Sequence, residues 1–600
     1  MKLSNFVADY LAKAGMTDVF MLTGGGAMHL NDAFGKHPKL KTTFMHHEQA
    51  CAMAAESYAR LTQKPAILNV TTGPGGINTI NGVFGAWTDS IPMIVISGQV
   101  RYDTTLEGCG IPNLRQMGDQ ECDIVRMVSG ITKYAVMIKD SNEILYHLQK
   151  AVYLATYGRP GPVWLDIPMN IQGATIDENN LKTFNPADIE ITPEISLSTI
   201  KTIIEKIKLA ERPVIMVGSG IRVSGSYDIF LKLLDQLRIP VVTAWNAHDA
   251  LYDAHPNYSG RPGSVGDRSG NFTVQNSDLL LILGSRLNIR QISYNWQSFG
   301  REAYKIMVDI DSAELQKPTL KIDCSVHADL KQFIHLLLQQ LNNTVVEKTD
   351  WLSWCQLRRE KYPVVLPEYW ENKDIVNPYC FMKSLSESLP DDQIVVTGDG
   401  TACVTAFQSF EIKKETRLYT NSGSASMGYD IPAAIGACVA SGEKKIVCLA
   451  GDGSAMQNIQ ELAAIAFKKY PIKIFLLNNQ GYHSIRQTQQ NFFGEPFVGV
   501  GQDSGLGFPN FEDLAKGFGI AYTRCENHDG LNEAIQKTLN SNEPHFCEVM
   551  LTLTQQFSPK LSSKRLTDGR MVTKPLEDMS PFLSTEELES NMIIPVLAEV

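Results

Sequence analysis

Two short polar motifs follow two apolar runs late in the chain, and their residue types suit a metal ion. Gly451-Asp452-Gly453-Ser454 comes after the run Lys445–Ala450, and Asn478-Asn479-Gln480-Gly481 comes after Ile472–Leu477. A helical pattern over Ile459–Ala466 lies between them, so the segment predicts a βαβ unit. Its right-handed crossover would place the two strand ends side by side and bring Asp452 to Asn479.

The oxygen atoms available there are those that a hard octahedral cation prefers. The Asp452 carboxylate, the Asn479 amide oxygen and the Gly481 carbonyl are predicted to bind Mg²⁺. Glycines let the backbone approach an anion closely, and a following helix N-terminus supplies unpaired N–H groups, so a diphosphate shared with the metal is the natural ligand. Either motif alone would be interpreted as an ordinary turn or strand end. The second Gly-Asp-Gly, at Gly398–Gly400, has no matching Asn-Asn, so we interpret it as a turn lining the site.

The elements that must position these motifs fall into three stretches, each alternating short β-branched runs with helical segments. This pattern predicts an α/β fold of three doubly wound parallel-sheet domains and a C-terminal tail. The central stretch has four apolar runs typical of a nucleotide-binding sheet: Pro213–Gly218, Ile239–Thr243, Leu279–Gly284 and Lys305–Asp309. We place the domains at residues 1–172, 195–342 and 374–555, the tail at 556–600, and linkers at Gln172–Glu194 and Asn342–Lys373.

Composition excludes several classes of protein. The 600 residues carry a formal charge of −11 without a basic block, which argues against nucleic acid as a partner. No run of 18 apolar residues predicts a membrane span, and the first residues do not resemble a secretion signal. Eleven scattered cysteines without a Cys-x-x-Cys pair favour reduced thiols, so we expect a cytoplasmic protein.

The segment from Gly451 to Gly481 resembles the thiamine diphosphate signature, and the wider chain is similar to the acetolactate synthase family. The similarity extends over nearly all 600 residues and is weakest in the central domain and the tail. It implies a pyrimidine-binding domain, a central domain and a diphosphate-binding domain in that order, with thiamine diphosphate and Mg²⁺ as cofactors.

Glu48 lies where the predicted strand Lys41–Met45 meets a predicted helix through Tyr58-Ala59-Arg60. The similarity implies that its carboxyl group hydrogen-bonds the pyrimidine ring of the coenzyme and promotes loss of the reactive proton. Without the similarity, a glutamate at a helix start is only a residue that the helix dipole favours.

Further roles follow from the similarity. Gln120 is a candidate contact near the reactive carbon, and Met427 would prop the coenzyme into its bent conformation. His483 could donate a proton to the acceptor, or it could be a polar wall residue. The residues assigned to coenzyme binding are Gly73, Pro74, Gly400, Thr401, Ala425, Met427, Gly451, Gly453, Ser454 and Tyr482.

The chain departs from the family near the expected acceptor pocket and in the expected flavin segment. Asp119 and Thr488 stand where the family has aromatic residues, so a hydroxylated acceptor such as a keto sugar is as plausible as a 2-oxo acid. FAD binding is left open, because the two aspartates of the flavin segment are replaced by Asn288 and Ile289. The candidate FAD residues are Gly218, Gly220, Arg286, Arg290 and Asp309.

Together these features predict a decarboxylating carboligase that transfers a two-carbon unit from pyruvate or another 2-oxo acid to a carbonyl acceptor. The alternatives are a simple 2-oxo acid decarboxylase, a flavin-linked pyruvate oxidase and a regulatory scaffold without activity. The similarity also implies a homodimer or homotetramer in which Glu48 of one subunit meets the Asp452 loop of another. We expect the tail to act as a lid over the active site.

Overall fold

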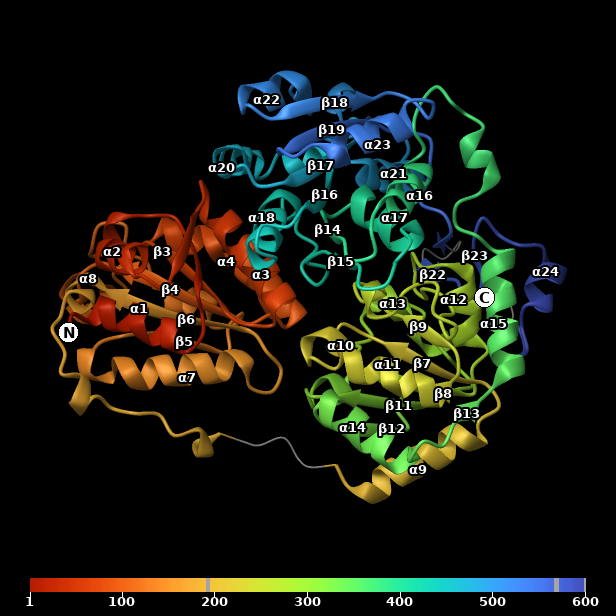
Figure 1. The fold of residues 1–600 in the computed structure, drawn as a ribbon, viewed down its shortest axis with the longest axis horizontal. Coiled ribbons are helices and arrows are strands. Elements are labelled where there is room, and N and C mark those ends of the chain that lie inside the picture. Colours follow the sequence, from red (N-terminus) through yellow and green to blue (C-terminus); the bar gives the residue numbers. More distant parts are fainter. Residues whose placement is uncertain (190–194, 566–570, 598–600) are drawn as a thin grey trace.

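Three parallel sheets, each covered by helices, form the body of the molecule (Figure 1). The computed structural model describes residues 1–189, 195–565 and 571–597. The predicted fold class is confirmed, since every strand pair within the three large sheets is parallel. The domain boundaries given above stay a prediction.

The first sheet has six strands, in the order β2 (Lys41–Phe44), β1 (Asp18–Met21), β3 (Ala66–Val70), β4 (Met93–Gln99), β6 (Pro162–Pro168) and β5 (Tyr134–Met137). Its helices are α1 (Leu3–Lys13), α2 (Met28–Lys36), α3 (Glu48–Thr62), α4 (Pro74–Asp89), α5 (Leu106–Cys109), α6 (Ile124–Val128), α7 (Ile144–Thr156) and α8 (Met169–Gln172).

The central sheet has five strands, in the order β12 (Cys324–His327), β11 (Tyr304–Asp309), β10 (Leu279–Leu283), β7 (Pro213–Val217) and β9 (Val241–Thr243). Its helices are α9 (Leu197–Leu209), α10 (Gly220–Val223), α11 (Tyr227–Gln236), α12 (Arg268–Gln275), α13 (Ile289–Ile292) and α14 (Leu330–Leu341), and β8 (Leu237–Arg238) pairs with β13 (Val346–Glu347). The second predicted linker contains a helix, α15 (Thr349–Lys361), because Trp351 and Cys355 share one helix face and are buried.

The third sheet has six strands, in the order β15 (Arg417–Tyr419), β14 (Ile394–Thr397), β16 (Ile446–Gly451), β17 (Ile472–Asn478), β19 (His545–Met550) and β18 (Ala521–Cys525). Its helices are α16 (Pro378–Ser388), α17 (Thr401–Ser409), α18 (Asp430–Ala440), α19 (Asp452–Ala455), α20 (Leu462–Lys468), α21 (His483–Phe492), α22 (Phe511–Gly517) and α23 (Leu531–Asn540). Strands β16 and β17 pair in register, Gly451 opposite Leu477, so their carboxyl ends are neighbours, as the βαβ interpretation requires.

The tail lies against the central unit. It contains the antiparallel pairs β20 (Lys560–Leu561) with β23 (Met579–Ser580) and β21 (Ser563–Arg565) with β22 (Met571–Thr573), and it ends in α24 (Thr585–Ser590). Glu577 is buried, and its carboxylate lies 2.8 Å from Arg301 Nη1. This part of the tail therefore has a charged anchor, the apolar packing of Leu576 against the central unit, and a buried Met579.

Helix α3 joins the first and third units, and small side chains allow the contact. Residues 50–60 of α3 are all buried, and five of them are alanines. A Cβ at Gly82 of α4 would come within 2.5 Å of Ala52, and one at Gly436 of α18 within 2.0 Å of the Ala54 carbonyl oxygen. Figure 1 shows α3 and α18 side by side between the two sheets. The helix that begins at Glu48 is thus held from two sides.

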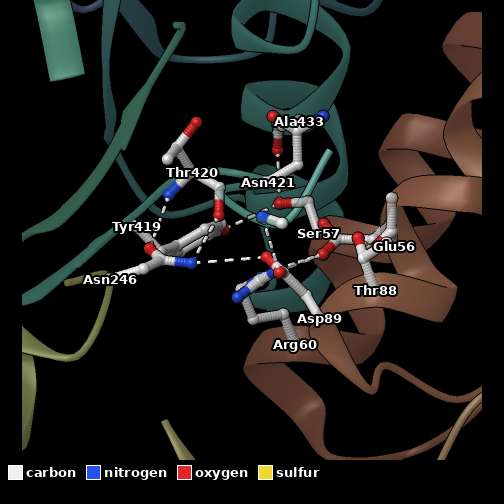
Figure 2. Close-up of polar contacts among 12 residues, drawn as sticks. Glu56, Ser57, Arg60, Thr88, Asp89, Asn246, Tyr419, Thr420, Asn421 and Ala433 are labelled. Carbon is white, nitrogen blue, oxygen red and sulfur yellow. Dashed lines mark hydrogen bonds and ion pairs between the residues drawn. The ribbon is translucent and has the colours of Figure 1, made fainter. Parts of the chain in front are cut away.

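All three units meet at one buried carboxylate, which Figure 2 shows in detail. Asp89 Oδ2 accepts hydrogen bonds from Arg60 Nη2 of α3 at 2.7 Å and from Asn246 Nδ2 of the central unit at 3.3 Å. Asp89 Oδ1 accepts from the Gly423 amide of the third unit at 2.8 Å. Arg60 also pairs with Glu56, whose pKa is raised by burial. The junction fixes the far end of the helix that carries Glu48.

Arg60→Met is expected to lower the thermal unfolding midpoint by several degrees, because it leaves Glu56 and Asp89 buried without their cation. Breaking a buried pair in this way costs about 3–5 kcal/mol. Differential scanning calorimetry measures the shift, with Arg101→Met as the matched control, since Arg101 and its partner Asp103 are both exposed. An unchanged midpoint for Arg60→Met would contradict a structural role of the network.

Candidate functional site

The Asp452 carboxylate lies at the carboxyl end of β16 and is held by two backbone amides. Oδ1 accepts a hydrogen bond from the Gly453 amide at 2.7 Å, and Oδ2 accepts from the Gly481 amide at 2.8 Å. The side chain is only 1% exposed, and this burial raises the pKa of Asp452 to about 7. A buried carboxylate without a countercharge favours binding of a cation.

Asn479 presents the second oxygen at the end of the neighbouring strand. Its Nδ2 donates to Thr401 Oγ1 at 2.9 Å, which fixes the orientation of the amide. The opposite atom, Oδ1, is buried and has no hydrogen-bond partner in the part of the chain that the structure describes. A buried oxygen without a hydrogen-bond donor, next to a buried carboxylate, is the arrangement expected of two oxygen ligands of a metal ion. The residues therefore fit Mg²⁺. Thr401, which the similarity assigns to coenzyme binding, thus also orients the amide of the proposed metal ligand Asn479.

Glycine is required at two positions of this loop. Gly481 has φ +124°, and a Cβ there would lie 1.9 Å from the Val500 carbonyl oxygen. A Cβ at Gly453 would lie 2.2 Å from the ring of Tyr482. The Tyr482 ring therefore lies beside the N-terminus of α19, where the diphosphate is expected.

Several residues predicted to bind the coenzyme lie close to Ser454. Its hydroxyl donates to the Asp430 carboxylate and accepts from the Gly428 amide at 2.8 Å. Met427 directly precedes Gly428 and is half-buried, and Ala425 two residues earlier has φ +51°. Gly400 lies near α21, since a Cβ there would be 3.6 Å from Ser484 Oγ. The third unit therefore groups its predicted residues in one place.

The first unit holds a second group around Glu48. Asn78 Nδ2 donates to Glu48 Oε2 at 3.0 Å, and a Cβ at Gly75, next to Pro74, would lie 3.6 Å from Glu48 Oε1. Gly73 packs against Gln120, whose carbonyl oxygen would lie 1.9 Å from a Cβ at Gly73. Glu48, Gly73, Pro74 and Gln120 thus lie together, as a set separate from the metal loop.

Within one chain, no hydrogen bond or ion pair of the described residues joins Glu48 to Asp452. Glu461, which the sequence analysis did not single out, connects the third unit to the segment just before Glu48. Its carboxylate accepts from the His46 amide at 3.1 and 3.3 Å, and burial raises its pKa to about 7. Glu461 thus fixes the turn before Glu48 to the third unit. One chain therefore presents two separate half-sites, one around Glu48 and one around Asp452 and Asn479.

His483 is the first residue of α21 and is buried. Its Nε2 lies 3.0 Å from the Gln555 carbonyl oxygen, which can only accept, so Nε2 carries the proton. Burial lowers the pKa of His483, which leaves Nδ1 as an unprotonated acceptor. In this arrangement the protonated nitrogen of His483 is already bonded to Gln555, and the two interpretations, proton donor and polar wall residue, both stay predictions.

A cavity of about 270 Å³ lies between the first and central units. Four of the five candidate FAD residues line it: Gly218, Gly220, Arg286 and Asp309. Asp309 is buried at the end of β11, and burial raises its pKa to about 6. Arg290 does not line it. Its guanidinium lies over the ring of Trp245, which is itself a wall residue, 5.1 Å from the centroid, and Arg290 is exposed.

Comparison with known proteins defines the class. Models of the thiamine pyrophosphate enzymes match in order along the chain: the N-terminal TPP binding domain at residues 1–127, the central domain at 200–337 and the C-terminal TPP binding domain at 394–549. Thiamine pyrophosphate is another name for thiamine diphosphate, so the predicted coenzyme is confirmed; Mg²⁺ is typical of the class, and the Asp452 loop fits it.

Curated relatives narrow this further. The chain is 31% identical to the acetolactate synthase large subunit of Lactococcus lactis over 93% of its length and 94% of the relative. It is 31% identical to the isozyme 2 large subunit of Escherichia coli, covering 92% and 96%, and 30% identical to the chloroplastic acetolactate synthase 2 of Nicotiana tabacum, covering 94% and 84%. The chain belongs to the acetolactate synthase large-subunit family. The prediction of a thiamine diphosphate-dependent carboligase is confirmed, and the decarboxylase, oxidase and scaffold alternatives are not favoured.

Proposed function

We propose that this enzyme decarboxylates pyruvate and joins the remaining two-carbon unit to a carbonyl acceptor. The observation that carries the proposal is the pair of buried oxygens, the Asp452 carboxylate and the unpartnered Asn479 Oδ1, on adjacent strand ends. When bound, thiamine diphosphate supplies a nucleophilic carbon and accepts the electrons released on loss of CO₂.

The chain's own residues then have distinct tasks. Asp452, Asn479 and the Gly481 carbonyl would hold Mg²⁺ and with it the diphosphate. The Glu48 carboxyl would hold the pyrimidine end and share a proton with it, and Asn78 orients that carboxyl. Met427 would set the bend between the two ends, and Gln120 would contact the substrate near the reacting carbon.

We propose at least a dimer, with each active site built from the Glu48 half-site of one subunit and the Asp452 half-site of another. Apolar side chains are exposed beside both half-sites. Ile77 and Phe84 of α4 are 41% and 40% exposed, and Ile485 and Phe492 of α21 are 49% and 55% exposed. Such surfaces are typical of subunit interfaces.

The polar residues near the expected acceptor pocket bear on the identity of the acceptor substrate. Asp119 is exposed next to Gln120, and Thr488 lies on the exposed side of α21, so both polar side chains are accessible to a ligand. They support a hydroxylated keto acceptor beside a second 2-oxo acid.

We also propose that FAD or a related nucleotide occupies the 270 Å³ cavity and that the tail covers the active site as a lid. No helix of the described residues is long and apolar enough to cross a bilayer, and the eleven cysteines are unpaired, which supports the cytoplasm.

The purified enzyme with thiamine diphosphate, Mg²⁺ and pyruvate is expected to release CO₂ and to form a branched condensation product. Mass spectrometry of products formed with a panel of keto acids and keto sugars identifies the acceptor. Free acetaldehyde as the sole product, whatever acceptor is added, would indicate a simple decarboxylase instead. Bleaching of a bound flavin during turnover would indicate an oxidase.

A further inference from the structure

The first residues of the tail lie along the first turns of α21. The Gln555 carbonyl accepts from His483 Nε2 at 3.0 Å, and the Phe557 amide donates to Gln487 Oε1 at 3.2 Å. Because His483 and Gln487 are four residues apart, they share one helix face. This face begins two residues after Gly481, so the tail segment covers the helix directly beside the metal half-site.

Two polar atoms on this face have no partner in the described parts of the chain, although both are buried. They are His483 Nδ1 and Gln487 Nε2, and the two side chains are 4% and 3% exposed. One is an acceptor and the other a donor, since the remaining atoms of each group are already paired with the tail. Buried polar groups are almost always hydrogen-bonded, so a ligand with polar groups is the simplest explanation for both.

Lys560 adds a charge to the same place. It begins β20 and is half-buried, and its ammonium group donates to Gln556 Oε1 at 3.3 Å. No carboxylate among the described residues pairs with its ammonium group, and burial lowers the pKa of Lys560. Gln556 in turn donates to Gln490 of α21 at 3.3 Å, so the lysine is tied to the helix.

We propose that Lys560, with Gln487 as a second donor, binds an anionic group of the acceptor substrate. The inference rests on the proposed carboligase function and restricts the acceptor to molecules that carry a carboxylate or a phosphate. An ammonium ion out of bulk water and without a countercharge is costly, and an anion from the substrate removes that cost. Two sources supply this chemistry, namely the carboxylate of a second 2-oxo acid and the phosphate of an esterified keto sugar.

Lys560→Met is expected to raise the KM for anionic acceptors about ten- to a hundredfold, the usual effect of a hydrogen bond to a charged group. Steady-state rates at saturating pyruvate are measured with a 2-oxo acid, a phosphorylated ketose and the same ketose without phosphate. The increase in KM for the anionic acceptors is expected to exceed the increase for the uncharged ketose by this factor. The arm that shows the larger loss identifies the source of the anion.

Lys560→Arg retains the charge and is expected to recover most of the affinity, which a purely structural lysine would not require. Gln487→Leu removes only the second donor and gives a smaller increase in KM, so the idea stays testable if Lys560→Met does not fold. Lys321→Met, at a side chain that is 91% exposed, is the matched control. Equal losses for charged and uncharged acceptors, or none for either, overturn the Lys560 assignment. Absence of pyruvate decarboxylation by the unaltered enzyme would overturn the proposed function instead.

Discussion

Glu48→Gln is expected to lower the rate of CO₂ release from pyruvate about 10²- to 10⁴-fold, the range that a positioned acid–base group contributes. Glutamine has nearly the same shape, and its amide oxygen can still accept the hydrogen bond that Asn78 Nδ2 gives to Glu48 Oε2 at 3.0 Å. The buried alanines of α3 are untouched, so the fold should be retained. What the variant loses is a carboxyl group that can share a proton with the coenzyme.

Turnover and coenzyme affinity must be measured separately for this variant. Stopped-flow CO₂ detection gives the rate, and titration calorimetry gives the affinity for thiamine diphosphate with Mg²⁺, which should change far less than the rate. Glu211→Gln is the matched control, because the Glu211 side chain is 84% exposed. Undiminished turnover in Glu48→Gln would rule out the role assigned to this residue.

The metal half-site could be predicted because all its parts lie in one short stretch of chain. Strand, turn, helix and strand follow one another from Ile446 to Asn478, and the handedness of the crossover leaves one arrangement for Asp452 and Asn479. The structure adds the orientation of the Asn479 amide, which depends on Thr401, 78 residues earlier. A local pattern predicts which atoms converge, but not which of them are already paired.

The remaining contacts could not be predicted, since they join residues distant in sequence. His46 and Glu461 are 415 residues apart, and Asp89 meets Asn246 and Gly423 from two other units. Such pairs leave no period or spacing in the sequence. Arg290 was grouped with the flavin residues by its position in a motif, and the motif did not predict that its guanidinium lies over the Trp245 ring.

Asp452→Ala is expected to weaken the Mg²⁺-dependent binding of thiamine diphosphate by at least about a hundredfold, because it removes the only carboxylate of the proposed metal site. The substitution also leaves the Gly453 and Gly481 amides without their acceptor. In the unaltered enzyme, ligand at about 100 times its Kd stabilises the folded state by about 2.7 kcal/mol. The thermal shift on adding coenzyme and Mg²⁺ should therefore be present in the parent and absent in the variant.

The chain supplies its own control for this experiment. Asp399 stands in the second Gly-Asp-Gly motif of the same unit, half-buried, with the Cys403 thiol 3.4 Å from its Oδ1. Because β14, which Asp399 follows, does not pair with β17, which leads to Asn479 and Gly481, Asp399→Ala should keep the Mg²⁺-dependent shift. If both variants lost the shift, or if Asp452→Ala kept it, the metal would have to be held by other groups. The difference between two aspartates in identical tripeptides thus isolates the contribution of the adjacent strand end.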